Sequence, residues 1–295
     1  MKNSAVTIGT FDGLHSGHRK LIEKLLAVSR RHGLKSVVVA FATPVKKVSG
    51  LLTTVEEKTA LLKKFAVDEI QILENTPDII NQSASSFFEE FLCKNLNAKH
   101  IVVGENFAFG KGREGNVRWR RKKGALTGVR VDVVRPVKKS GRIVSSSVIR
   151  ELVASGSIKK AGSLLGRHYS ISGRVVSGRG LGRKLGFPTL NLSVEKGKLL
   201  PTGIFAGYVE AGKELFPSAV FIGRRSTVTD MGEIFPEAHL LDYNGIWKAK
   251  NVTVHLTARI RNEKKFKSVE ELTAQIAKDV SAVRRALQPC RKRGK

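Results

Sequence analysis

Apolar residues follow two different patterns in the two halves of the chain. The first 140 residues alternate short β-rich runs with segments of helical periodicity. The β-rich runs lie at 5–9, 36–41, 69–73, 100–104 and 130–134, and the helical segments at about 18–32, 55–65 and 84–96. Strands separated by amphipathic helices of this length predict right-handed βαβ crossovers. We therefore expect a doubly wound α/β domain, with a parallel sheet covered by helices on both faces.

The pattern changes after a helical stretch at 145–166. Short alternating strands broken by glycine follow at 169–180, 203–212, 218–223, 237–245 and 251–260. This pattern predicts a small antiparallel β-barrel or sandwich. A helix of about 268–287 closes the second half. From this change we place one domain at 1–165, a second at 166–290 and a basic tail at 291–295.

Composition indicates a folded protein without a membrane span. The chain has 295 residues, of which 41% are hydrophobic, enough for a sizeable core. It has no run of about eighteen apolar residues and no apolar segment of a secretory signal at its N-terminus, so we expect no membrane association and a cytoplasmic location. Cys93 and Cys290 form no spacing motif, which indicates neither a disulfide framework nor a zinc site.

The formal net charge of +28 indicates an anionic ligand, a nucleic acid or an anionic membrane as a partner. The charge is unevenly spread. Residues 51–100 hold 5 Lys and Arg against 8 Asp and Glu, whereas residues 101–150 hold 13 against 3. A basic patch is therefore expected, and its charge leaves open whether it binds a partner or is a solvated face. The sequence does not indicate an oligomeric state.

Two glycine-rich stretches resemble nucleotide-binding loops without matching them. GKGREG at 110–115 fits G-x-G-x-x-G, but no strand runs directly into it. GENFAFGKG at 104–112 has one residue too many for a Walker A loop and no Ser or Thr after Lys111. We exclude both kinds of site and expect an ordered loop that could close over a ligand.

The stretch TIGTFDGLHSGHRKLI at 7–22 places chemistry where a strand passes into a helix. The apolar strand ends at Ile8, Gly9 and Gly13 allow tight turns, and a helix is expected to begin at His18. The carboxyl end of such a strand is where open α/β sheets bind ligands, and the free N–H groups of a helix N-terminus attract phosphate. This turn is therefore the candidate phosphate site of the first half.

Two histidines occupy this turn. His15 and His18 are three residues apart and can face the same side, while Gly17 leaves room for phosphates. Such imidazoles could stabilise charge on a phosphate in the transition state without covalent catalysis. The alternative interpretation is that one histidine caps the helix and the other packs.

GTFDGLHSGH resembles the H-x-G-H motif of nucleotidyltransferases, which transfer an adenylyl or cytidylyl group from a nucleoside triphosphate and release pyrophosphate. It is most similar to the G-x-F-D-G-x-H-x-G-H form of the bacterial bifunctional riboflavin kinase/FMN adenylyltransferases, the FAD synthetase family. LTTVEEKTALL, VVGENFAFGKGREGN and VSSSVIRELVASGSIKKAGSLLGR look like the N-terminal module of that family. GRKLGFPTLNL, KLLPTGIFAGYV, EAHLLDYNG and IRNEKKFKSVEELTAQIAKDV look like its kinase module. The resemblance covers nearly the whole chain.

For the first module, a nucleotidyltransferase domain, the resemblance implies an ATP and FMN site. It makes His15 and His18 catalytic contacts to the ATP phosphates, and it implies flavin binding by Asn106. The other ATP-binding residues that it implies are Gly9, Phe11, Asp12, Gly17, Ser146, Ser147 and Arg150. The last three match an S-S-x-x-I-R motif, whose hydroxyls and guanidinium could grip a triphosphate at a helix start, and the serines could also cap that helix.

For the second module, a β-barrel, the resemblance implies a riboflavin kinase site. P-T-x-N at 188–191 supplies Thr189 and Asn191 for Mg²⁺ and the ATP phosphates, and hard oxygen ligands suit this ion. Gly186 belongs to the preceding glycine-rich flap and is implied to bind ATP. Glu237 is implied to be the base that takes the proton of the riboflavin 5′-hydroxyl, and Arg261 is implied to lie near the flavin.

The chain departs from the family pattern in three places. Phe221 and Ser226 stand where the family usually has Asn and Pro, and 246–249 replaces a common D-L-Y-G. These two departures concern the kinase site. A P-H-P often found near FATPVKK is absent, which concerns the adenylyltransferase.

The resemblance implies an enzyme that converts riboflavin and ATP to FMN and ADP, and then FMN and ATP to FAD and pyrophosphate. Its implied ligands are therefore riboflavin, FMN, ATP and Mg²⁺. One alternative keeps the adenylyltransferase and has an impaired kinase. The other is a basic nucleic-acid-binding protein, suggested by the charge and by RWRRKK and RKRGK. These runs have little aromatic interleaving and no RNA-binding motif, so no specific nucleic acid is expected.

Overall fold

The structure is a computed structural model that describes residues 2–224 and 234–288. Ser226, Cys290 and the basic tail at 291–295 lie outside the described residues. The chain divides into two compact units, Met1–Ser146 and Ser147–Lys295. This division lies earlier in the chain than the boundary at residue 165 that we predict from the sequence pattern, and the functional boundary stays a prediction.

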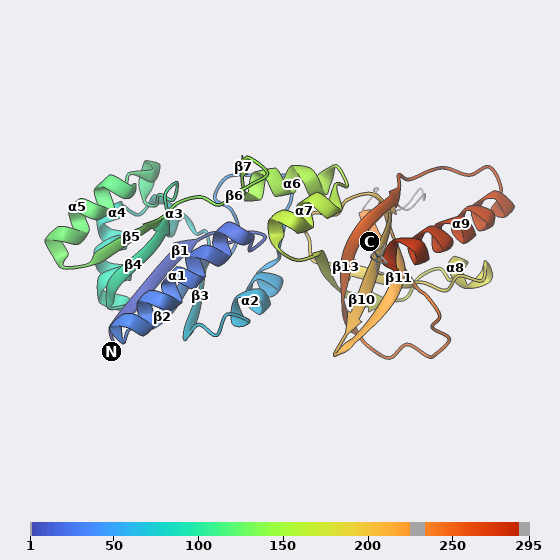
Figure 1. The fold of residues 1–295 in the computed structure, drawn as a ribbon, viewed down its shortest axis with the longest axis horizontal. Helices are drawn as coiled ribbons and strands as arrows, with labels where there is room; N and C mark the ends of the chain where they lie inside the picture. Colours follow the sequence, from blue (N-terminus) through green and yellow to red (C-terminus); the bar gives the residue numbers. More distant parts are fainter. Residues whose placement is uncertain (1, 225–233, 289–295) are drawn as a thin grey trace, which may run out of the picture. The chain divides into compact units, whose positions relative to one another are not determined.

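The first unit is built on a five-stranded parallel sheet (Figure 1). Its order is β3-β2-β1-β4-β5, and every neighbouring pair is parallel. The strands are β1 (Ser4–Gly9), β2 (Lys35–Phe41), β3 (Glu69–Leu73), β4 (Ala98–Gly104) and β5 (Arg130–Val134). The predicted doubly wound α/β domain is confirmed.

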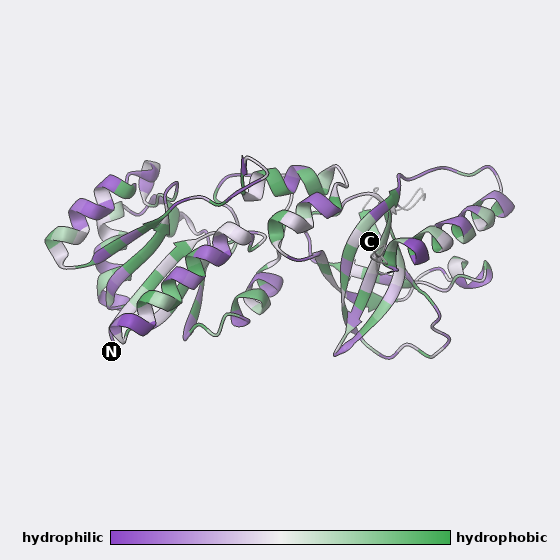
Figure 2. Ribbon diagram, in the orientation of Figure 1, coloured by the Kyte–Doolittle hydropathy of each residue, from purple (hydrophilic) through white to green (hydrophobic). Residues whose placement is uncertain are grey.

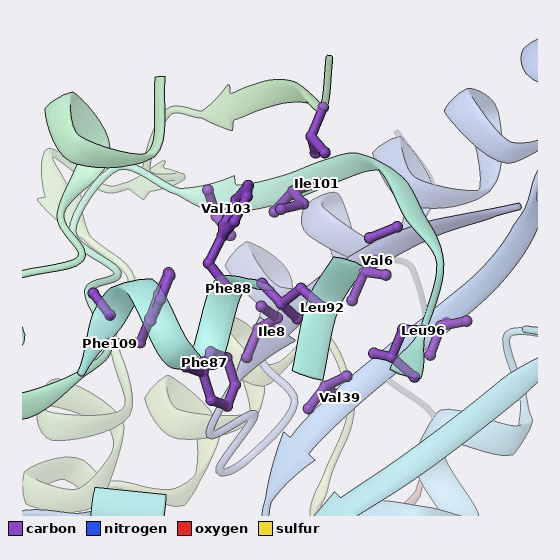
Figure 3. Packing of buried hydrophobic residues seen from close by; sticks show 14 of the residues in the cluster. Val6, Ile8, Val39, Phe87, Phe88, Leu92, Leu96, Ile101, Val103 and Phe109 are labelled. Carbon is purple, nitrogen blue, oxygen red and sulfur yellow. The ribbon is translucent and has the colours of Figure 1, made fainter. Parts of the chain in front are cut away.

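Alternate residues of the central strands pack into two separate cores because both faces of the sheet are covered. Val6 and Ile8 point into a cluster with Phe88 and Leu92, which Figure 3 shows. Ala5 points to the opposite face, into a cluster that includes residues of the first helix. The central strands β1, β2 and β4 are mostly buried and are accordingly mostly green in Figure 2, as expected for strands covered on both faces.

Helices of several lengths connect these strands. They are α1 (Ser16–His32), α2 (Val55–Lys63), α3 (Pro77–Asn81), α4 (Ala84–Ser86), the π-helix η1 (Phe87–Asn95), the 3₁₀ turn η2 (Lys111–Arg113) and α5 (Val117–Thr127). A short hairpin, β6 (Lys138–Lys139) and β7 (Arg142–Ile143), follows β5. The sequence analysis predicted α1, α2 and the α4–η1 helical segment.

Helix α5 is a helix that the apolar pattern missed, because its sequence, VRWRRKKGALT, is mostly basic. Its ends carry clear signals. The Asn116 side chain accepts a hydrogen bond from the Trp119 N–H at the start, and Gly128, with φ of 73°, ends the helix. These caps could have identified the helix from the sequence.

The second unit contains a closed barrel in the order β10-β11-β12-β9-β8-β13, with antiparallel pairing throughout. Its strands are β8 (Tyr169–Val176), β9 (Leu190–Val194), β10 (Gly203–Ala211), β11 (Glu214–Arg224), β12 (Ile234–Leu240) and β13 (Asn251–Arg261). The predicted small antiparallel barrel is confirmed. Strand β9 was not predicted; it is short and begins within the P-T-x-N motif, with which it shares residues 190 and 191.

The helices described from Ser146 onward are α6 (Ser146–Ala154), α7 (Ile158–Leu165), α8 (Leu181–Lys184) and α9 (Val269–Leu287). Helix α9 packs on β10, β11 and β13, and its Val283 lies in a buried cluster with Ala206 and Leu241. The C-terminal helix is confirmed. Among the described residues, no helix combines the length and the apolar character needed to cross a bilayer.

Candidate active sites

The turn between β1 and α1 is conformationally strained. Phe11, Gly13 and Leu14 have φ of 51°, 80° and 39°, and only the glycine adopts this region without steric cost. The Ser146 hydroxyl donates to the carbonyl oxygen of Asp12 at 2.8 Å and holds the turn from the start of α6. Strain of this kind persists only where the surroundings fix the backbone, and it is concentrated at functional sites.

The two histidines stack at the start of α1. The helix begins at Ser16, before the predicted start, and His15 is its N-cap: the Nδ1 of His15 accepts a hydrogen bond from the His18 N–H at 3.4 Å. The His15 and His18 rings stack with centroids 3.7 Å apart. Because Nδ1 is an acceptor, a neutral His15 carries its proton on Nε2. His15 thus caps the helix, as the alternative interpretation expects, and its contact with the ATP phosphates stays a prediction.

Gly17 lies against the His15 ring, a contact that the sequence analysis did not predict. A Cβ at Gly17 would lie 3.1 Å from the His15 ring, so the glycine leaves room for the stacked imidazole. The predicted clearance for phosphates remains a prediction. At the end of β1, a Cβ at Gly9 would lie 3.3 Å from the Phe11 ring, so this glycine too leaves room for an aromatic ring.

Asp12 and Phe11 are both buried in this structure. The Asp12 carboxylate accepts hydrogen bonds from the Thr53 N–H at 3.0 Å and the Thr53 hydroxyl at 3.3 Å. The same hydroxyl oxygen accepts from the Gly13 N–H at 3.0 Å. The Phe11 ring belongs to the core beneath α1. Asp12 therefore ties the turn to Thr53, and the ATP contacts implied for Asp12 and Phe11 stay predictions.

Thr53 is a residue of the site that the sequence analysis missed. It directly precedes a capping box, in which the Thr54 hydroxyl accepts from the Glu57 N–H and the Glu57 carboxylate accepts from the Thr54 N–H. The T-x-x-E spacing could have predicted the start of α2. It could not have predicted that Thr53 contacts a turn 41 residues earlier.

The loop after β4 packs on the start of helix α4. A Cβ at Gly110 would lie 2.6 Å from the Ala84 nitrogen, and the Glu114 carboxylate accepts from that N–H at 2.6 Å. Asn106 is exposed, and its carbonyl oxygen accepts from the Arg113 guanidinium at 3.0 Å. The Asn106 side chain is therefore open to a ligand.

A fully buried arginine lies beneath this loop. The Arg120 guanidinium lies over the Phe107 ring at 5.4 Å and donates to the Gly115 carbonyl oxygen at 2.9 Å. Burial lowers the pKa of Arg120 to about 10. The sequence analysis treated this residue only as part of a basic run.

The S-S-x-x-I-R motif lies at the start of α6. Ser146 belongs to the first unit, whereas Ser147 and Arg150 belong to the second. Ser146 and Arg150 are four positions apart in one helix and share a face. The structure thus brings Ser146 to the β1–α1 turn and places Arg150 one helical turn after it.

A cavity of about 460 Å³ lies against the barrel wall. Glu237 comes from β12, which is paired with β11 on one side and β9 on the other, so it does not lie on an edge strand. The Thr189 hydroxyl donates to its carboxylate at 3.4 Å, and Asn191 is its partner in the β9–β12 register. All three line the cavity together with Arg261. The structure therefore brings together four of the five kinase residues implied by the sequence, and Gly186 is not among the residues that line the cavity.

The glycine-rich flap packs closely on this group. A Cβ at Gly178 would lie 2.1 Å from the Asn191 amide nitrogen, and a Cβ at Gly182 would lie 2.4 Å from the Phe187 carbonyl oxygen. A Cβ at Gly186 would have no neighbour within 4 Å, but the φ of this residue is 83°. The first two glycines allow close packing, and the third allows the turn.

Gly178→Ala is expected to lower riboflavin phosphorylation about 10- to 100-fold, because the added methyl group displaces the Asn191 amide from the cavity wall. FAD formation from added FMN should not change. Initial rates of both reactions measure this, with Ser177→Ala as the matched control. Unchanged phosphorylation in Gly178→Ala would show that the position of Asn191 is not critical.

Arg261 is held by the C-terminal helix. Its guanidinium donates to both carboxylate oxygens of Asp279, from Nε at 2.9 and 3.1 Å and from Nη2 at 2.7 Å. Gln275 donates to the same carboxylate at 2.9 Å. This arrangement fixes Arg261 at the cavity, and the implied contact with the flavin stays a prediction.

The departures from the family pattern fall in different places. Phe221 lines the cavity and packs edge-to-face on Phe235. Trp247 instead packs with Phe216 and Tyr243, and Ile246 is 84% exposed. The 246–249 segment thus supports an aromatic cluster, whereas Phe221 makes one wall of the cavity apolar.

Comparison with known proteins connects both units to flavin chemistry. A family model described as FAD synthetase matches residues 1–148, and one described as riboflavin kinase matches residues 165–287. The bifunctional riboflavin kinase/FMN adenylyltransferase of Escherichia coli strain K12 is 35% identical over 281 residues, which cover 93% of this chain and 90% of the relative. The chain belongs to the bifunctional riboflavin kinase/FMN adenylyltransferase family. The family resemblance is therefore confirmed.

A second curated relative and one solved structure are also similar to the chain. The bifunctional riboflavin kinase/FMN adenylyltransferase of Buchnera aphidicola subsp. Schizaphis graminum is 32% identical over 296 residues, covering 96% of this chain and 94% of the relative. A solved structure described as a macrolide-efflux protein from Streptococcus pneumoniae matches with a TM-score of 0.84 and 28% identity, covering 96% of this chain and 94% of that one. This bifunctional riboflavin kinase/FMN adenylyltransferase family member is thus a transferase with a kinase and an adenylyltransferase domain.

Proposed function

We propose that the barrel unit phosphorylates riboflavin and that the sheet unit adenylylates the FMN so formed. The observation that best supports the kinase assignment is the placement of Glu237, Thr189 and Asn191 around one cavity. For the adenylyltransferase it is the stacked His15 and His18 at the N-terminus of a 17-residue helix. Each site then has its own set of side chains.

In the kinase, Glu237 acts as the general base. Its carboxylate takes the proton of the riboflavin 5′-hydroxyl, whose oxygen attacks the γ-phosphorus of ATP, while the bond from that phosphorus to the β-phosphate oxygen breaks and ADP leaves. The hydrogen bond from Thr189 orients the carboxylate. The flap packs on Asn191 and so fixes its amide beside the carboxylate.

Thr189 and Asn191 fit a magnesium ion. Their hydroxyl and amide oxygens are hard ligands, and Gly178 keeps a side chain from the space beside the amide. When bound, magnesium neutralises charge on the ATP phosphates. Residues 2–224 and 234–288 contain no group of three His, Cys, Asp or Glu side chains arranged for a metal, which is consistent with a site that depends on substrate phosphates for further ligands.

In the adenylyltransferase, the protein positions phosphates and stabilises their charge. A phosphate oxygen of FMN attacks the α-phosphorus of ATP, and the bond to the leaving pyrophosphate breaks. His15 donates from Nε2, and His18 and the first N–H groups of α1 offset the charge that develops. Ser146 holds the turn that carries both histidines. Because both reactions consume ATP, we propose that the enzyme acts in the cytoplasm.

A chromatographic assay with riboflavin, ATP and magnesium tests this function. FMN should appear first and FAD after it, and EDTA should prevent FMN formation. Radiolabelled ATP with riboflavin as the sole acceptor separates the two enzyme alternatives, since an adenylyltransferase without kinase activity makes no labelled FMN. If no flavin nucleotide forms from either riboflavin or FMN, the proposed function is wrong.

A further inference from the structure

A lysine of α2 is buried at the carboxyl end of β2. Lys58 is 1% exposed, although lysine is almost never fully buried unless it is paired. Its ammonium donates to the carbonyl oxygens of Phe41 at 2.5 Å and Ala42 at 3.0 Å. These carbonyls lie where the chain leaves the sheet. Lys58 therefore fixes the direction in which the chain leaves β2.

The residues from 42 to 54, which we call the β2–α2 segment, are anchored at both ends. Near the first end, the Asn75 amide donates to the Thr43 carbonyl oxygen at 2.7 Å and to its hydroxyl at 2.8 Å. At the other end, Thr53 bonds to the Asp12 carboxylate and the Gly13 N–H of the β1–α1 turn. The segment thus connects the position of Lys58 to the turn that carries the two histidines.

Burial and the nearby carboxylates shift the pKa of Lys58 in opposite directions. Burial lowers the pKa of Lys58 to about 8, while the carboxylates of Asp12, in the β1–α1 turn, and Glu74, after β3, act to raise it. On α2 itself, the carboxylate of the preceding residue, Glu57, is engaged by the cap at Thr54. Lys58 therefore carries its charge at neutral pH and loses it within the mildly alkaline range.

A charge is not needed for packing at this position. Leucine or methionine has comparable length and helix propensity without the desolvation cost of a buried ammonium. An ammonium supplies hydrogen bonds of charge-assisted strength to two backbone carbonyls and attraction to Asp12. The ammonium of Lys58 thus holds the backbone beside the candidate ATP site in place.

We propose that the ammonium of Lys58 is a positioning group for adenylyl transfer, which holds the β2–α2 segment against the β1–α1 turn and ceases to do so when it is deprotonated. The proposal rests on the assignment of adenylyl transfer to the sheet unit. Lys58 makes no contact with the reacting atoms in this scheme. Its effect passes through Thr53 to Asp12 and Gly13, and so to the backbone that precedes His15.

The test is the pH dependence of kcat/KM for FMN between about pH 6.5 and pH 9.5 in the full-length protein. Wild type should lose activity above about pH 8. Lys58→Arg, which stays charged, should remove this alkaline loss. Lys58→Met should lower FAD formation about tenfold or more at pH 7 and give a flat profile. Riboflavin phosphorylation by the barrel unit, measured in the same preparations, should not change.

Lys63→Met, an exposed lysine of the same helix, is the matched control and should keep the wild-type profile. The proposal is overturned if Lys58→Arg or Lys58→Met retains the alkaline loss, or if wild type shows none. If Lys58→Met loses both activities through misfolding, the profile of Lys58→Arg decides the question. If wild type forms no FAD from FMN at any pH while it phosphorylates riboflavin, the assignment of adenylyl transfer fails, and this proposal fails with it.

Discussion

Glu237→Gln lowers FMN formation from riboflavin by about 10²- to 10⁴-fold, the range expected when a general base is removed. The amide has nearly the shape of the carboxylate and can still accept the hydrogen bond from Thr189, so the barrel should fold normally. It cannot take a proton from the 5′-hydroxyl. Conversion of added FMN to FAD should be unaffected, because that reaction belongs to the other unit.

Initial rates of both half-reactions measure the effect, and Glu214→Gln, an exposed carboxylate at the start of β11, is the control. A second observable is the pH profile: the acidic limb that reports protonation of the base should disappear from the residual kinase activity of Glu237→Gln. A wild-type rate of FMN formation would remove Glu237 from the mechanism.

His18→Ala should reduce FAD formation from FMN by about 10²- to 10³-fold, the loss expected when a preorganised donor to a developing charge is removed. With riboflavin as substrate, FMN should accumulate. The His18 ring also stacks on His15 and meets the edge of Phe11, with its centroid 5.2 Å from that of Phe11, so truncation also removes packing.

His18→Phe separates these two effects, since phenylalanine keeps a stacked ring but has no N–H donor. We expect it to lose as much activity as His18→Ala. His32→Ala, at the exposed end of the same helix, is the control. If His18→Phe retained wild-type FAD formation, the role of His18 would be packing alone.

The fold could be predicted from the sequence wherever burial makes apolar residues repeat at the spacing of a helix or a strand. The strands of the parallel sheet and helix α9 were predicted because their apolar residues must repeat to reach a core. Helix α5 was missed because only its caps, Asn116 and Gly128, distinguish it from a basic loop. Strand β9 was missed because it is short and its first two residues also belong to the P-T-x-N motif.

The residues of the candidate sites also divide into those that the sequence could predict and those that it could not. His15 and His18 are near neighbours in the chain, so their shared location could be predicted from spacing alone. The bond of Thr189 to Glu237 joins residues 48 positions apart, and that of Thr53 to Asp12 joins residues 41 apart. No local pattern contains such pairings. For the same reason, neither the inward direction of the Asp12 carboxylate nor the buried position of Lys58 could be predicted.

Strand β12 alternates between the two surfaces of the barrel wall. Ala238 is completely buried, while its neighbours Glu237 and His239 line the cavity that we propose as the kinase site. Since β12 is hydrogen-bonded to a strand on each side, adding or deleting a single residue within it would exchange these positions and place the carboxylate in the apolar interior. Natural length variation in this enzyme should therefore be confined to its loops, and the spacing along β12 should be invariant in chains that retain the kinase.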